Sequence, residues 1–143
     1  MITTFVGVAS VDITPSYPVM LGGFGQRITP SESVHDAIET VALCIGEDDP
    51  LLVITADLIA MAAPVTKEVV EQIHLATGID SNRILLAASH THSAPLPYDP
   101  SGSAIGVQQF SQQLTEALIK AGIEAFHSRR PARLVSGYGN ARI

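Results

Sequence analysis

The sequence predicts an α/β fold in which helices pack on a mixed, partly parallel sheet. Short runs of aliphatic and β-branched residues alternate with two longer segments whose apolar residues recur at helical spacing. Strands that alternate with helices in this way favour a sheet with at least one parallel pair. The length of 143 residues fits one domain with a hydrophobic core. Because 46% of the residues are hydrophobic and only 5% are aromatic, we expect that core to consist mainly of Val, Ile, Leu and Ala.

The first half of the chain predicts three strands and a glycine-rich loop. The expected strands are residues 5–13, 38–45 and 51–56. Thr14-Pro15 ends the first strand, because proline lacks a backbone donor and restricts the residue before it. The loop at residues 21–27 contains three glycines. The turn signals at residues 46–50 indicate that the second and third strands form a hairpin.

The second half predicts two helices and two strands. Helices are expected at residues 65–77 and 107–126, and strands at residues 84–88 and 132–138. Gly78 ends the first helix. The strand at residues 84–88 is a continuous apolar run, which is typical of a strand buried on both faces. A polar loop with several prolines separates it from the second helix.

Charge and composition exclude some classes of function. A net charge of −6 and a pI near 5.2, with no basic stripe, argue against binding to nucleic acid. Charged residues make up only 15%, below the roughly 25% typical of soluble domains. We therefore expect part of the surface to be covered by a partner subunit or by more of the same chain. No apolar run is long enough for a transmembrane segment, and no signal peptide is visible. The expected location is the cytoplasm, or outside the cell if a leader has been removed.

Three of the five histidines fall in loops beside the ends of predicted strands. His90 and His92 directly follow the strand at residues 84–88, where α/β proteins commonly place ligands and catalytic groups. If the backbone stays extended, residues two apart share a face, and both imidazoles then point into one cavity as candidate zinc ligands. The alternative is that the pair only forms hydrogen bonds to the loop backbone.

Other polar residues beside the strand ends are also candidates. His35 is a possible third imidazole at the site, and Asp36 or Asp57 is a carboxylate that orients one. The alternative for His35-Asp36 is a loop histidine beside a turn aspartate, and Asp57 could simply cap a turn. His74 and His127 are discounted, because the first lies within a predicted helix and the second at a helix end. Cys44 lies in an apolar run, which predicts a buried structural thiol.

Small residues around the histidines allow two interpretations. Gly22, Gly23 and Gly25 permit close approach of the backbone to a ligand, or form a flexible loop. The loop lacks the spacing and the lysine of a phosphate loop. Ser89 and Ser93 flank the histidines without a nucleophile-elbow pattern, so the sequence supports serine-hydrolase chemistry only weakly.

Several motifs occur in the order seen in the neutral, non-lysosomal ceramidases, and the chain resembles that family over essentially its whole length. The motifs are Val8-Ala9-Ser10-Val11-Asp12-Ile13-Thr14-Pro15, Leu21-Gly22-Gly23-Phe24, Val34-His35-Asp36, Thr55-Ala56-Asp57-Leu58, Leu86-Ala87-Ala88-Ser89-His90-Thr91-His92-Ser93-Ala94-Pro95 and Pro131-Ala132-Arg133-Leu134. The segment around His90 and His92 is the most specific. Ser89 and Ala94 stand where Thr and Gly are usual in the ceramidases themselves, which indicates a bacterial relative of the family.

The resemblance implies a zinc-dependent hydrolase of an N-acyl amide bond, in ceramide or a related lipid. It makes residues 1–143 the N-terminal part of a larger catalytic domain. It assigns His90 to zinc and His92 to catalysis and substrate contact. His35, Gly22 and Gly23 are expected at the same pocket, with His35 as a second catalytic histidine.

The resemblance also implies partners for this chain. The family completes its zinc site with a second His, a Glu and a Tyr from later in the sequence, beyond residue 143. The expected partners are therefore an N-acyl sphingoid or similar lipid amide, and either the rest of the polypeptide or a second copy. We expect the 143-residue chain alone to lack zinc and activity.

Two other interpretations stay open. One is a different His-x-His metallohydrolase. Metallo-β-lactamase-like proteins need Asp-His directly after the second histidine, where Ser93-Ala94 stands here, and amidohydrolase barrels place the motif on their first strand. The other is a catalytically incomplete fragment or a binding module.

Overall fold

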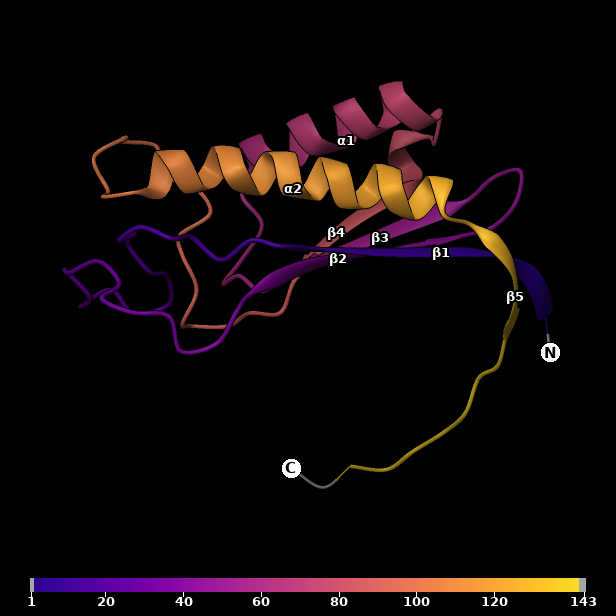
Figure 1. Ribbon diagram of the computed structural model, residues 1–143, viewed down its shortest axis with the longest axis horizontal. Helices are drawn as coiled ribbons and strands as arrows, with labels where there is room; N and C mark the ends of the chain where they lie inside the picture. Colours follow the sequence, from indigo (N-terminus) through magenta and orange to yellow (C-terminus); the bar gives the residue numbers. More distant parts are fainter. Residues whose placement is uncertain (1, 142–143) are drawn as a thin grey trace.

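In the part of the chain that the structure describes, five strands form one sheet, and two helices cover one of its faces (Figure 1). The computed structural model describes residues 2–141. The elements in chain order are β1 (Ile2–Asp12), β2 (Glu39–Ile45), β3 (Leu51–Ala56), α1 (Ala63–Thr77), a short 3-10 turn (Ser81–Arg83), β4 (Ile84–Ala88), α2 (Val107–His127) and β5 (Arg130–Leu134). Within the described residues, neither helix is long and apolar enough to cross a membrane.

The sheet has the order β4-β3-β2-β1-β5 and is mixed, as the sequence predicted. β2 pairs with β1 and β3, and β5 with β1, all antiparallel. β3 and β4 are parallel, and α1 connects them. Because parallel neighbours end at the same edge of a sheet, Ala56 lies opposite Ala88. The loops that follow β3 and β4 therefore start side by side.

The core lies between the sheet and the helices. Alternate residues of β2, namely Thr40, Ala42 and Cys44, are buried beneath the helices, as the two-residue period of a strand requires. Burial raises the pKa of the Cys44 thiol, which makes it a structural rather than a reactive cysteine. α2 rests directly on β1 at Gly7, where an added Cβ would collide with the Ala125 carbonyl oxygen.

The buried helix residues follow the predicted spacing. They are Val65, Val69 and Ile73 in α1, and Phe110, Leu114 and Leu118 among others in α2. Each helix therefore turns one apolar stripe to the core, and the exposed side of α1 is mostly polar, with Leu75 as an exception at 70% exposed.

Three predicted strands differ from those observed. β1 begins at Ile2 rather than at residue 5, because its first residues pair with β5. β4 is not buried on both faces. It forms an edge of the sheet, and Leu85 is 56% exposed, because the helices cover one face only. β5 lies at residues 130–134 rather than 132–138, because it pairs with β1, and Leu134 already lies opposite Ile2 at the start of β1. Pro131 is tolerated there because β5 is an edge strand.

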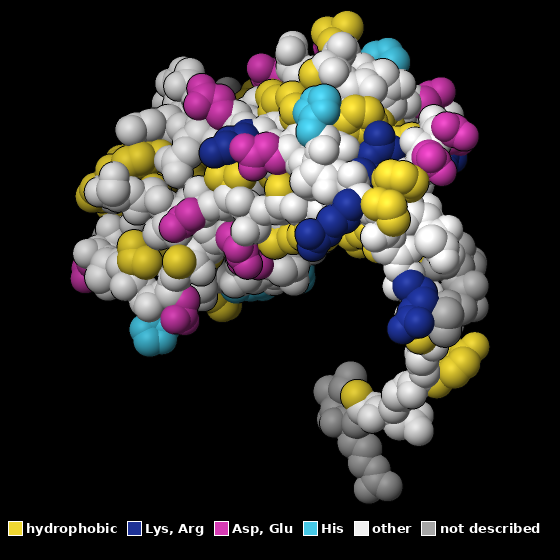
Figure 2. All heavy atoms as spheres, turned by 45° about the vertical axis from the view of Figure 1, so that its right-hand side comes forward, with side chains coloured by type: hydrophobic (Ala, Val, Ile, Leu, Met, Phe, Trp, Pro, Cys, Tyr) yellow, Lys and Arg dark blue, Asp and Glu magenta, His cyan; other side chains and the backbone are white. Residues whose placement is uncertain are grey.

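The face of the sheet away from the helices carries many apolar residues beside polar ones such as Ser10 and Thr55. By strand alternation and register it carries Val6, Val8, Val41, Leu43, Ile45, Leu51, Val53 and Leu85. We call these residues the open face. The segment after β5 runs on this side of the sheet (Figure 1) and leaves the body of the molecule, so that a hollow lies between them (Figure 2).

Candidate functional site

The parallel pairing of β3 and β4 determines where His90 lies. One residue past β4, the backbone N–H of Ser89 donates to the Ala56 carbonyl, at 3.0 Å. One residue further, His90 Nδ1 lies 2.7 Å from the carbonyl oxygen of Ile59, in the loop after β3. A carbonyl only accepts, so Nδ1 carries the proton. In the neutral ring Nε2 then keeps its lone pair, which is the state that binds a metal.

His90 also has an unusual backbone. Its φ of 64° lies in the left-handed region, and among the described residues it is the one non-glycine with positive φ. Such a conformation costs about 1–3 kcal/mol in a residue other than glycine. The expected extended backbone is therefore wrong at His90. The two imidazoles nevertheless lie side by side, since the ring centroids of His90 and His92 are 5.1 Å apart at an interplanar angle of 82°.

The glycine-rich loop packs against the segment that carries the histidines. Gly22 N donates to Ala94 O and Leu96 N to Met20 O, both at 2.9 Å, around a bridge between residues 21 and 95. Gly23 has a φ of 100°, and a Cβ there would lie 2.6 Å from the Cβ of His92. The absence of a side chain at Gly23 thus lets this loop touch His92.

Sequence reasoning missed three residues of this site. The Ile59 carbonyl fixes the His90 ring. The Phe24 ring meets His92 edge to face, with centroids 5.2 Å apart. Arg27 donates from Nη1 to Gly22 O at 2.9 Å and to His92 O at 3.2 Å. The available signal was an aromatic and an arginine three residues apart in a loop otherwise rich in glycine.

His35 and Asp36 lie at a cleft beside the segment that carries His90 and His92. Their side chains are 98% and 87% exposed, with His35 Nε2 3.6 Å from Asp36 Oδ2. They line a cleft of about 600 Å³ whose walls include Thr91 and Ser93, the residues that alternate with the two histidines. The structure therefore brings His35 to a cleft beside the His90 segment, while His90 and His92 themselves are in contact with each other.

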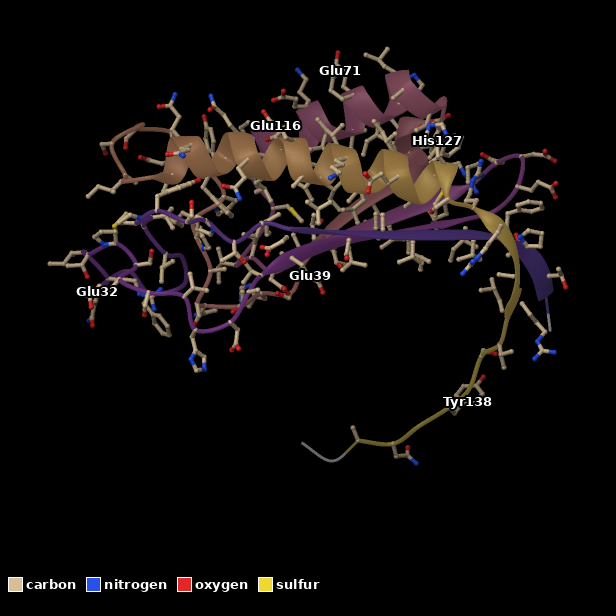
Figure 3. All side chains as sticks on the ribbon, in the orientation of Figure 1. Glu32, Glu39, Glu71, Glu116, His127 and Tyr138 are labelled. Atoms are coloured by element: carbon tan, nitrogen blue, oxygen red, sulfur yellow. The ribbon has the colours of Figure 1, made fainter. Side chains whose placement is uncertain are left out.

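The remaining candidates have local partners. The Asp57 carboxylate accepts a hydrogen bond from the Glu39 N–H at 3.2 Å, which ties the end of β3 to the start of β2. His74 Nδ1 bonds to Ile79 O at 2.7 Å at the end of α1. His127 packs on Phe126 at the end of α2, and Figure 3 places it at the opposite end of the molecule from the loop with Glu32.

The metal-binding capacity of this chain is limited. Within residues 2–141, no group of three or more His, Cys, Asp or Glu side chains is arranged to hold a metal ion. Catalytic zinc normally takes three protein ligands. The donor chemistry at His90 fits zinc, and further ligands are needed to complete a site.

Comparison with known proteins identifies the fold. No protein-family model matches this sequence, and neither does any curated protein. Neutral ceramidase from Pseudomonas aeruginosa has a similar structure, with a TM-score of 0.77 over 92% of this chain at 19% sequence identity. A ceramidase complexed with C2 has a TM-score of 0.73 over 89% of this chain at 20% identity. This chain spans only 23% and 22% of those two chains. The resemblance to neutral ceramidases is thus confirmed for the fold, which matches one part of those longer chains.

Proposed function

We propose that this chain is part of a zinc-dependent hydrolase that cleaves the N-acyl amide bond of ceramide or a related lipid. The observation that carries the proposal is the His90 ring, whose Nδ1 is bound to the Ile59 carbonyl and whose Nε2 is left to bind metal. The strained backbone at His90 adds support, because such strain concentrates at functional sites. The ceramidase fold of the chain supports the choice of reaction.

In this proposal His90 and His92 have different roles. Zinc, when bound, supplies a Lewis acid for the amide carbonyl and brings the pKa of water toward about 7. His90 holds the metal through Nε2. His92, whose ring touches the ring of His90, contacts the substrate and stabilises charge that develops on the carbonyl oxygen.

The cleft beside His35 provides room for part of an amphiphilic substrate. Its walls combine apolar residues such as Tyr17, Val34 and Pro95 with the polar pair His35 and Asp36. We assign His35 to proton handling or to a polar group of the substrate, with Asp36 orienting its ring. Gly22 and Gly23 act by shaping the loop next to His92.

The open face indicates a further partner. Val8 is 58% exposed and Leu51 41%, on a face where aliphatic residues outnumber polar ones such as Ser10 and Thr55. Large exposed apolar patches usually mark interaction surfaces. Because the similar structures are about four times as long as this chain, we propose that more polypeptide of the same catalytic fold covers the open face and supplies the missing zinc ligands. A second copy of this chain is the alternative occupant.

The test uses the full-length polypeptide that contains these residues, assayed for bound zinc and for hydrolysis of a fluorescent N-acyl sphingosine. We expect one zinc per site and turnover in the unmodified protein. His90→Ala is expected to lose the zinc, because it removes a ligand. His92→Ala is expected to keep the zinc but to lose about 10²-fold or more in kcat, as for loss of an oxyanion-stabilising group.

His127→Ala is the matched control, since that histidine is at the far end of α2 and is expected to change neither property. Full zinc content and unchanged turnover in His90→Ala would contradict the proposal. Zinc binding without hydrolysis of any N-acyl lipid would favour the binding-module interpretation instead.

A further inference from the structure

Three rings and a guanidinium form a continuous row from the glycine-rich loop to the zinc-binding histidine. The guanidinium carbon of Arg27 lies 5.2 Å from the centroid of the Phe24 ring. Phe24 meets His92 edge to face at 71°, and His92 meets His90 at 82°. The ring of His92 therefore lies between the ring of Phe24 and the ring of His90.

Arg27 is also bonded to the backbone on both sides of this row. Its Nη1 donates to Gly22 O in its own loop and to His92 O in the histidine segment. The two segments are separately held by the Gly22–Ala94 and Leu96–Met20 backbone hydrogen bonds. Those bonds keep the loops paired without Arg27, so the distinct contribution of Arg27 is directed at His92.

We infer that Arg27 is a positioning residue, which sets the orientation of the His92 ring through the His92 carbonyl and the Phe24 ring. The effect of Arg27 on catalysis rests on the proposed function, in which His92 contacts the substrate. The planar guanidinium can donate in its plane and stack with its face at the same time, which the ammonium of lysine cannot do.

The chain contains a matched arrangement for comparison. Arg129 stacks on Phe126, with 4.1 Å from the guanidinium carbon to the ring centroid, and Phe126 meets His127 edge to face at 5.1 Å. Its Nη1 also donates to two loop carbonyls, those of Gly46 and Glu47. This second row lies at the end of α2, where Figure 3 shows His127. It therefore provides a control with the same kinds of contact at a distance from the site.

The experiment is NMR of the zinc-free 143-residue chain, with the histidine ring protons assigned, together with thermal unfolding. We expect Arg27→Gln to shift the His92 ring signals, because Phe24 and its ring current move relative to His92, and to leave those of His127 unchanged. Arg129→Gln is expected to shift the His127 ring signals and to leave those of His92 unchanged. Arg27→Lys is expected to unfold at nearly the wild-type temperature. Its His92 ring signals are nevertheless expected to differ from those of the wild type.

Phe24→Leu separates the two contacts of Arg27. It is expected to shift the His92 ring signals while the amide signals of His92 and Ser93 stay close to wild type, since the backbone hydrogen bond remains. His92 ring signals that stay at their wild-type positions in both Arg27→Gln and Phe24→Leu would overturn the inference, even if the thermal midpoint falls. None of these readouts requires zinc or activity, so they stand if the proposed hydrolase function fails. In the active full-length protein, Arg27→Lys is expected to lower kcat by about 10²-fold with zinc content unchanged.

Discussion

Between the sheet and α2, the side chains of Phe110, Leu114 and Leu118 are completely buried on a regular helix. At the edge beyond β3 and β4, His90 is exposed, lies on a left-handed residue and is held by one hydrogen bond to a loop carbonyl. The first region is stabilised by the hydrophobic effect, which needs only apolar residues of the right size and spacing. The second depends on a few directional contacts between loops. The two regions are therefore held together by different kinds of interaction.

The largest effect is expected in the core. Phe110→Ala removes a fully buried ring from the interface between α2 and the sheet and is expected to lower the free energy of unfolding by about 3–5 kcal/mol. Ile28→Ala, in a loop where the side chain is 86% exposed, is expected to change it by about 0.5 kcal/mol or less. Urea unfolding measures both. An equal loss of unfolding free energy in the two variants would mean that burial of Phe110 does not stabilise the core more than the exposed loop side chain does.

A smaller effect is expected where the two loops touch. Gly23→Ala forces a positive φ on a residue with a Cβ, at a cost of about 1–3 kcal/mol. The new methyl also lies where His92 is, so the His92 ring signals are expected to shift in NMR spectra. Gly25→Ala is the matched control, because no heavy atom lies within 4 Å of its added Cβ. A Gly23→Ala variant as stable as Gly25→Ala, with unchanged His92 signals, would show that the loops are not in tight contact.

The smallest effect concerns acid stability of the loop before α2. The Asp99 carboxylate accepts hydrogen bonds from the Ala104 N–H and from Ser101, and these lower its pKa from 3.8 to about 2. A lowered pKa stabilises the folded state above the unfolded value of 3.8, and that contribution disappears as the pH falls through about 2. Asp99→Asn is expected to remove this part of the pH dependence of unfolding. If the free energy of unfolding of Asp99→Asn changed between pH 4 and pH 2 as it does in the wild type, this role of Asp99 would be contradicted.

The difference between the two regions also decides what the sequence could predict. The helices and most strands followed from apolar spacing, because burial under one covering layer imposes that spacing directly. The bounds of β4 were predicted correctly, but the exposure of its second face was not, since Leu85 in a continuous apolar run looks the same whether covered or exposed. The start of β5 was missed because Arg130-Pro131 resembles a loop, although proline is allowed in an edge strand.

In the candidate site, the sequence placed His90 and His92 beyond the correct strand and predicted that their rings are neighbours. It did not predict the left-handed backbone of His90, because residues other than glycine rarely adopt it. It also did not reveal Ile59 or Arg27 as partners. Their contacts with the histidines span 31 and 65 residues of sequence and exist only once the loops have come together.

The assignment of His90 to zinc is tested by a zinc titration of this chain that is followed by histidine ¹⁵N chemical shifts, with calorimetry for the affinity. Because the chain supplies one assigned ligand, we expect binding weaker than micromolar, which is lost in His90→Ala and weakens in acid, where protons compete with the metal for the imidazole. The ring nitrogen that responds is expected to be His90 Nε2, while Nδ1 stays protonated against Ile59. A response at His90 Nδ1, or first at His35, His74 or His127, would contradict the assignment of zinc to His90 Nε2. Submicromolar binding that depends on His90 would instead show a complete zinc site within these 143 residues.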